Sequence, residues 1–242
     1  MIKFFRHIRQ RMLSENKFSK YLLYAIGEII LVVIGILIAL QINNWNGQEK
    51  LRQKELALLG EMYQNLKLDS ASVSINIWRS EIVLGSSNAV LRQLEERIPW
   101  NDSMEVHYAR LALGTLSRPV RSAYENLKAI GIDLITNDSL RFQIGSLYES
   151  QYPFNERIEQ EFELPIRNSV LIPQLQKHVR TMSVRESAKP LVLEALYDDH
   201  EFQEAIRSVI QGQELVLWAY GETLEKINKL IESTKNALKN GG

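Results

Sequence analysis

Residues 21–46 read YLLYAIGEIILVVIGILIALQINNWN, and this stretch decides how the chain is organised. Between residues 21 and 42 its only charged side chain is Glu28. A helix of about 20 mostly apolar residues is long enough to cross the hydrocarbon core of a bilayer. The stretch therefore predicts a transmembrane helix over residues 21–46, with the lipid bilayer as its first partner.

The flanks of this helix predict its direction. Residues 1–20 carry six Lys or Arg side chains against one acid, Glu15, whereas the first basic residue after the span is Lys50. Positively charged flanks stay on the cytoplasmic side. We therefore expect a cytoplasmic N-terminus in the inner membrane and a periplasmic C-terminal domain. A cleaved signal peptide fits less well, because the apolar region is long, contains Glu28 and is not followed by a small-x-small cleavage site.

Polar and small residues of the predicted span fall on one stripe at about 100° per residue. The stripe consists of Tyr21, Tyr24, Glu28, Gly35, Ala39 and Asn46. Gly35 and Ala39 form a small-xxx-small pair, which lets a second helix approach closely. We expect the span to form a homo-oligomer through Tyr24, Glu28, Gly35 and Ala39.

Glu28 has two interpretations. A carboxylate within a membrane requires a partner, water or protonation, which would make Glu28 functional. Alternatively, it lies close enough to the cytoplasmic end for its side chain to reach the headgroups or Lys20, with no further role.

Both ends of the span carry residues suited to lipid headgroups. Residues 1–13, MIKFFRHIRQRML, place apolar side chains along one side of a short helix, which is typical of an interfacial segment. Its basic residues Lys3, Arg6, Arg9 and Arg11 would contact anionic headgroups, unless they serve only as the orientation signal. Trp45 marks the headgroup layer at the other end.

The remaining residues, 47–242, form the predicted exterior domain. The first 20 residues have a charge of +5 and the span of −1, so this domain has −4 of the chain's net zero. An acidic domain argues against nucleic acid as a partner. The chain contains no cysteine, which excludes disulfides and thiolate metal sites.

The exterior domain shows helical periodicity at both of its ends. Alternating three- and four-residue steps predict a helix from about residue 49 to 98, ending before Pro99, and a second long helix over 199–239. The first seam consists of Leu56, Leu59, Tyr63, Leu66, Ser70, Val73, Ile77, Ser80, Leu84, Ser87, Leu91, Leu94 and Ile98. The second consists of Ile206, Ile210, Gln213, Leu217, Tyr220, Leu224, Ile227, Ile231, Thr234 and Leu238.

The middle of the chain predicts shorter helices. One is expected from Asp102 to Leu116, with a restart after Ser117 that stops at Gly131. Another is expected over 138–172, bent or broken at Pro153 and frayed after Pro165. Residues 173–198 are the least regular part of the domain, and we expect its one long connection there, with a short helix near 190–197. The fold class is therefore all-α: a transmembrane helix followed by an elongated antiparallel helical bundle, in which the two long helices bury their seams against each other.

Two stretches resemble a known family. LSENKFSKYLLYAIGEIILVVIGILIALQINNWN and SAYENLKAIGIDLITNDSLRFQIGSLYE are similar to a Bacteroidota family of single-pass membrane proteins that is catalogued as a domain of unknown function. The resemblance implies an N-terminal anchor and a helical exterior domain, and it implies no activity.

No sequence motif indicates an enzyme. The four histidines are far apart, and the chain has no H-E-x-x-H, G-x-S-x-G or glycine-rich phosphate loop. Asp198 and Asp199 are interpreted as a helix cap rather than metal ligands. Glu156, Glu159 and Glu163 share a helix face, interpreted as solvated rather than as a cation site.

Three hypotheses follow for function. The first is a non-enzymatic anchored module that binds a membrane or periplasmic protein, senses a ligand or acts as a scaffold. The second is a subunit of a transport or proton-coupled complex that uses Glu28. The third is an enzyme whose site is assembled from distant residues. No catalytic residue, cofactor or metal is predicted.

Overall fold

The computed structural model describes the backbone of residues 18–240 and the side chains of residues 22–240. Contacts divide the chain into two compact units, Met1–Lys54 and Glu55–Gly242. Helices account for almost all of the regular structure, and the described residues contain one sheet, of two short strands. The all-α prediction is confirmed.

The first helix, α2, runs without interruption over Phe18–Glu95. The two helices predicted at 21–46 and about 49–98 are therefore one, and Gly47, Gly60 and Gly85 do not break it. The helix ends where Arg97 takes a positive φ of 52°, two residues before Pro99. The Ile98 N–H donates to the Gln93 carbonyl at 2.9 Å across this left-handed residue, a bond typical of a helix C-terminus.

The chain then returns beside α2 through short helices, η1 (Asp102–Met104), α3 (Glu105–Arg110), α4 (Ser122–Ile130) and η2 (Ile132–Leu134). The predicted end of α4 at Gly131 is confirmed, since Gly131 has a φ of 119°. The predicted continuation to Leu116 and restart after Ser117 are wrong, because residues 111–121 form no helix. We call these residues the extended segment.

Backbone groups of the extended segment bond to side chains on other elements instead of to each other. The Leu116 carbonyl accepts from Asn76 Nδ2 at 3.2 Å, and the Val120 N–H donates to Asp69 Oδ1 at 2.8 Å. Buried backbone groups need such partners, and here α2 supplies them. Polar side chains of α2 thus bond to backbone groups that a helix would bond internally.

Helical turns then continue from residue 138 to 178. They comprise α5 (Asp138–Gly145), η3 (Ser146–Gln151), α6 (Tyr152–Ile158), η4 (Glu159–Glu163), η5 (Ile166–Leu171) and α7 (Ile172–His178). Helical states continue through Pro153 and Pro165, so a break at Pro153 and fraying after Pro165 are wrong, while a bend at Pro153 stays a prediction. The wider turns η3, η4 and η5 each end just before an X-Pro pair. Proline has no N–H, so a carbonyl in the preceding turn loses its usual hydrogen-bond partner. In a turn with a five-residue spacing, that carbonyl accepts instead from the N–H one residue further along the chain.

The predicted irregular connection contains a hairpin that the sequence did not indicate. Strand β1 (Val179–Ser183) pairs antiparallel with β2 (Ser187–Pro190), with Thr181 opposite Ala188. The expected short helix near 190–197 is α8 (Leu193–Leu196). The last helix, α9 (His200–Lys239), starts at Asp199, whose side chain accepts from the Phe202 N–H. The predicted helix cap is confirmed there.

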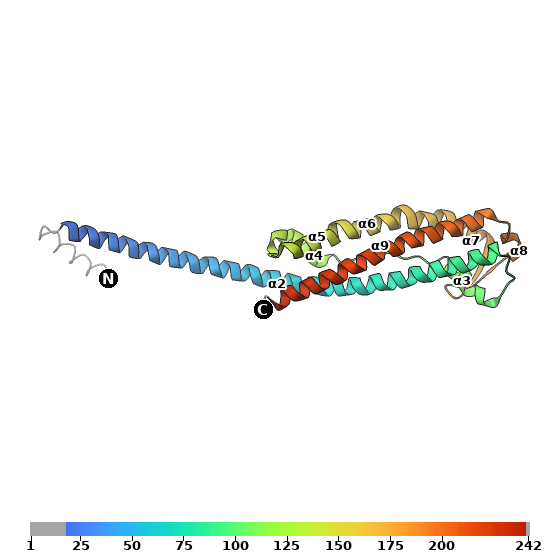
Figure 1. Ribbon diagram of the computed structural model, residues 1–242, viewed down its shortest axis with the longest axis horizontal. Coiled ribbons are helices and arrows are strands. Elements are labelled where there is room, and N and C mark those ends of the chain that lie inside the picture. Colours follow the sequence, from blue (N-terminus) through green and yellow to red (C-terminus); the bar gives the residue numbers. More distant parts are fainter. Residues whose placement is uncertain (1–17, 241–242) are drawn as a thin grey trace. The chain divides into compact units, whose positions relative to one another are not determined.

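Within the bundle, α9 runs antiparallel to the second half of α2 (Figure 1). Arg207 pairs with Glu95 at 2.5 Å near one end, and Ser70 Oγ donates to Asn228 Oδ1 at 3.1 Å nearer the other. One core cluster contains Leu59 and Leu66 of α2 together with Ile227 and Leu230 of α9. The expected packing of the two long helices is confirmed.

Half of each predicted seam is displaced by one residue. In α2 every seventh residue from Leu59 to Leu94 is buried as predicted, but the alternate buried positions are Glu55, Met62, Asp69, Asn76, Val83 and Val90. In α9 every seventh residue from Ile206 to Thr234 is buried as predicted, but the alternate buried positions are Val209, Val216, Thr223 and Leu230. Each helix packs against more than one neighbour, so its buried face is wider than a two-helix seam and turns toward both.

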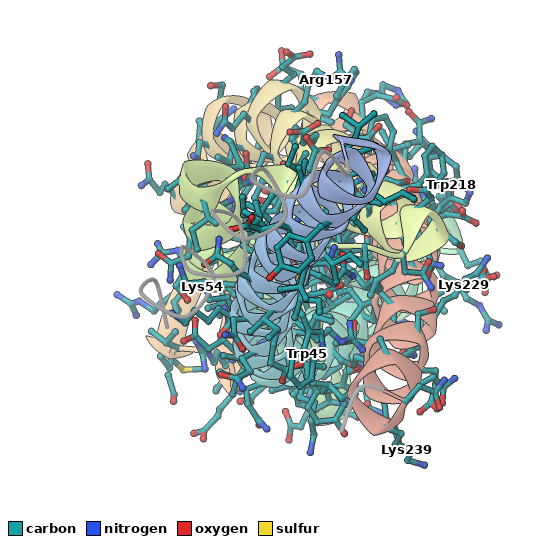
Figure 2. All side chains as sticks on the ribbon, turned by 90° about the vertical axis from the view of Figure 1, so that its left-hand side faces the viewer. Trp45, Lys54, Arg157, Trp218, Lys229 and Lys239 are labelled. Carbon is teal, nitrogen blue, oxygen red and sulfur yellow. The ribbon has the colours of Figure 1, made fainter. Side chains whose placement is uncertain are left out.

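Outward-facing side chains of the bundle include large ones. Figure 2 shows Arg157, Trp218 and Lys229 projecting away from the interior. Trp218 is 57% exposed although its ring meets that of Phe154 edge-on, with the ring centroids 5.9 Å apart. Isolated exposed aromatics of this kind are ordinary on a soluble surface.

Candidate functional site

The residues predicted for membrane association lie on the first part of α2. Because the helix is continuous there, Tyr24, Glu28, Gly35 and Ala39 do share one face, at steps of four, seven and four residues. Tyr24 and Glu28 are half-buried, while Gly35 and Ala39 are exposed. A Cβ added at Gly35 would meet nothing within 4 Å, so the face is open at Gly35 among the described residues.

The predicted headgroup residues divide between described and undescribed parts of the chain. Lys3, Arg6, Arg9 and Arg11 lie outside the described residues. Trp45 lies on α2 and is 65% exposed.

The bundle contains a group of buried carboxylates that the sequence did not indicate. Asp69 on α2 is 2% exposed. It accepts from Tyr152 Oη at 2.6 Å and from the Val120 N–H. Burial raises the pKa of Asp69, and the two hydrogen bonds oppose that shift. The carboxylate therefore joins α2, α6 and the extended segment.

Glu159 plays the same part from the other side of the extended segment. Its Oε1 accepts from Tyr220 Oη of α9 at 2.6 Å and from the Ser117 N–H at 2.9 Å. The side chain is 4% exposed, and burial raises its pKa. The extended segment is thus held between two buried acids, one on α2 and one on η4.

Glu163 is a further buried acid, one helical turn after Glu159. It pairs with Arg167 Nη2 at 3.0 Å. Burial raises the pKa of Glu163 to about 7, although the Arg167 charge opposes the shift. Glu163 is therefore the buried group in the bundle best placed to change its charge near neutral pH.

Arg167 depends on a glycine in the extended segment. Its guanidinium lies against Gly114, where an added Cβ would stand 1.1 Å from Nη1. No larger residue fits at 114 while Arg167 keeps this position. The ion pair of Glu163 is therefore coupled to the course of the extended segment.

The interpretation of Glu156, Glu159 and Glu163 as one solvated face is wrong for two of the three. Glu156 is half-buried and pairs with Arg121 at 2.5 Å, but Glu159 and Glu163 point into the bundle. In the turn 159–163 the one apolar side chain, Phe162, is instead 49% exposed. Hydrophobic periodicity therefore points the wrong way here, and no pattern in the sequence identifies the buried acids.

Asp199, which was considered as a metal ligand, and two of the histidines have other contacts. Asp199 caps α9 and its Oδ2 lies 3.0 Å from His178 Nε2. His107 contacts Ser86 Oγ at 3.2 Å, and its pKa is lowered by burial and then by the Arg110 charge. Among residues 22–240, no three His, Asp or Glu side chains are grouped so that they could hold a metal ion.

A family model described as "Family of unknown function (DUF6090)" matches residues 28–192, which is more than half of the chain. The chain belongs to this family. Neither the search of curated proteins nor the search of solved structures gave a match.

The DUF6090 match includes the apolar part of α2 from Glu28 onward and four buried acids, Glu55, Asp69, Glu159 and Glu163. It stops before α9, which supplies Tyr220, the partner of Glu159. The matched region of this chain thus contains these carboxylates and the extended segment, while α9, which closes over them, lies beyond the match.

Proposed function

We propose that this chain is a non-enzymatic, membrane-anchored module. The apolar part of α2 crosses the inner membrane once, the N-terminus stays in the cytoplasm, and the helical bundle lies in the periplasm, where it binds a protein partner or a ligand. Membership of a family of unknown function brings no activity with it, so the proposal rests on the chain itself.

The observation that carries the anchor is the exposure of the apolar helix. Within the described residues one helix, α2, is long and apolar enough to cross a membrane, and none of its most apolar window is buried. Leu31 is 73% exposed and Leu37 is 58% exposed. A core helix of a soluble domain would bury such side chains, whereas lipid accepts them.

The bundle supports a binding rather than a catalytic role. Its buried acids are each engaged in holding elements together, by hydrogen bonds to backbone N–H groups and tyrosines or by an ion pair. An enzyme site needs such groups to face a reacting atom in a cleft. The exterior surface is therefore where a partner would bind.

Cysteine labelling tests the orientation, because the chain has no cysteine of its own. In cells with a permeabilised outer membrane, Asn240→Cys should react with a membrane-impermeant maleimide and Ser14→Cys should not. Release of a chain shortened by its N-terminal apolar segment into the soluble periplasmic fraction would show a cleaved signal instead of an anchor. Reaction of Ser14→Cys alone would reverse the topology and overturn the periplasmic placement.

A second candidate function is supported by Glu28. It is the one charged residue of the span between residues 21 and 42, and it shares a helix face with Tyr24 and Gly35. A protonatable acid in a helix–helix contact is suited to a subunit of a proton-coupled membrane complex. Pull-down from mild detergent with mass spectrometry separates the two: a transport complex that is lost with Glu28→Gln favours the second function.

A further inference from the structure

A surface pocket of the bundle gathers three arginines. Trp78, Arg79 and Ile82 of α2 line one side, Arg110 closes the end of α3, and Arg185 comes from the turn between β1 and β2. The pocket has a volume of about 170 Å³. We call it the arginine pocket.

Separate elements bring these arginines together, so their meeting is a product of the fold. The hairpin that carries Arg185 is fixed against α3, because Lys189 of β2 pairs with Glu105 at 2.7 Å. Arg185 itself has a φ of 75°, which residues other than glycine rarely adopt. The turn therefore holds an arginine where its backbone would favour glycine or asparagine.

The charge of the pocket is not neutralised within the described chain. Ion pairs in the bundle engage other arginines, among them Arg92, Arg97, Arg121, Arg141, Arg167 and Arg207. None of these pairs involves Arg79, Arg110 or Arg185. Three like charges around one hollow repel each other, and an anion bound between them removes that repulsion.

The rest of the pocket wall is apolar. Trp78 is 60% exposed, and Ile82 and Leu113 lie beside it. An exposed indole next to guanidinium groups suits a ligand that has an apolar part beside its charge. The volume is below the range of about 300–1,000 Å³ that is typical for drug-sized ligands, which limits the ligand or its bound end to a few groups.

We propose that the arginine pocket binds a small organic anion with two or more negative charges and an adjoining apolar group, of which a phosphate monoester is the simplest example. Guanidinium groups bind phosphate oxygens in a bidentate manner, and Trp78 packs against the apolar group. This proposal goes beyond membrane anchoring, and it holds whichever way the chain crosses the membrane.

Calorimetric titration of the full chain in detergent tests the pocket with three probes: phenyl phosphate, inorganic phosphate and phenol. Phenyl phosphate should bind more tightly than inorganic phosphate, and phenol, which lacks the charge, should not bind measurably. Arg110→Gln should weaken phenyl phosphate binding at least about tenfold, as expected for the loss of a charge-assisted pair. Absence of saturable binding for both phosphates overturns the proposal.

Arg180 provides the matched control, because it lies exposed on the same hairpin but does not line the pocket. Arg180→Gln should change the affinity less than about twofold, as expected for an exposed charge outside the site. Equal losses for the Arg180 and Arg110 variants would show general charge attraction and would contradict a built site. Should Arg110→Gln disturb the fold, detected by circular dichroism, Arg185→Gln replaces it, because that side chain is exposed on a turn.

Trp78→Ala tests the apolar half of the ligand. It should bring the affinity for phenyl phosphate down to that for inorganic phosphate and leave inorganic phosphate unchanged. Competition by dihexanoyl phosphatidate then distinguishes the sources of the phosphate: stronger competition than by phenyl phosphate assigns a lipid headgroup, and weaker competition assigns a free small molecule. Unchanged phenyl phosphate affinity in Trp78→Ala would show that Trp78 does not contact the ligand and would overturn the proposed ligand class.

Discussion

The two parts of α2 place opposite kinds of side chain in opposite surroundings. Between residues 22 and 54 large apolar side chains are exposed, for example Leu23 at 71%. Between residues 55 and 95 polar side chains are buried, for example Glu55 at 1% and Asn76 at 4%. One continuous helix therefore contains both exceptions to the usual partition of residues.

This difference indicates that the side chains of the two parts suit different surroundings. The first needs a medium that accepts apolar side chains, which is the argument for lipid. The second is surrounded by protein that needs hydrogen bonds, since Glu55 accepts from the Thr136 N–H at 2.8 Å and Asp69 from the Val120 N–H. In the bundle, buried polar side chains of α2 thus bind the backbone of the chain between Val120 and Thr136.

The largest expected effect is on Asp69. Asp69→Ala leaves the Val120 N–H and the Tyr152 hydroxyl buried without an acceptor, which should lower the free energy of unfolding by about 4 kcal/mol. Leu68→Ala is the matched control one residue earlier, where the side chain is 61% exposed, and it should cost less than about 0.5 kcal/mol. Urea unfolding followed by circular dichroism measures both. A larger loss for the leucine would break the comparison, because the bundle would then depend on apolar contacts at this point.

The second expectation concerns pH. The pKa of Glu163 is raised from 4.5 to about 7 in the folded chain, so the folded state holds this proton more tightly than the unfolded state does. Stability from this group is therefore fully present below about pH 4.5 and is lost as the pH rises to about 7, by an amount of the order of 3 kcal/mol. Burial raises the pKa values of Asp69 and Glu159 in the same direction.

Glu163→Gln isolates that contribution, because glutamine keeps the shape and cannot ionise. The free energy of unfolding of the variant, measured by urea titration at several pH values, should fall less steeply between pH 4.5 and 7 than that of the unchanged chain. Identical slopes would mean that Glu163 does not titrate in this window and that its burial is offset by Arg167.

The smallest effect is expected in the apolar part. Gly35→Ile fills the open face beside Ala39 and should weaken self-association by about 1–2 kcal/mol, measured in a membrane two-hybrid assay. Ile34→Leu, on the neighbouring face, should have no effect. If both variants associate as well as the unchanged chain, the small-residue stripe carries no contact and the apolar part is an anchor alone.

The sequence was sufficient for the elements whose apolar residues recur regularly. The two long helices, the stop at Gly131 and the cap at Asp199 all follow from local rules and are confirmed. The same apolar regularity misplaced half of each seam, because each helix packs against more than one neighbour. In α2 it also discounted polar residues such as Asp69 and Asn76, which face inward.

The remaining differences arise where tertiary contacts override local preference. Residues 111–116 have a helical pattern, yet the segment is extended because side chains of α2 and η4 provide partners for its backbone. Pro153 suggested a bend or break and Pro165 suggested fraying, but wide turns before them keep the chain helical. The arginine pocket had no local signal, since Arg79, Arg110 and Arg185 are joined only by the fold.

The extended segment has a consequence for how the chain folds. Its hydrogen bonds to Asn76, Asp69 and Glu159 join residues that are 40, 51 and 42 positions apart, and it is held between acids from α2 and η4. Helices that form rapidly by local contacts cannot close over a segment that has not yet docked. We therefore expect docking of residues 111–121 to limit the folding rate, which makes this helical protein slower to fold than its secondary structure suggests.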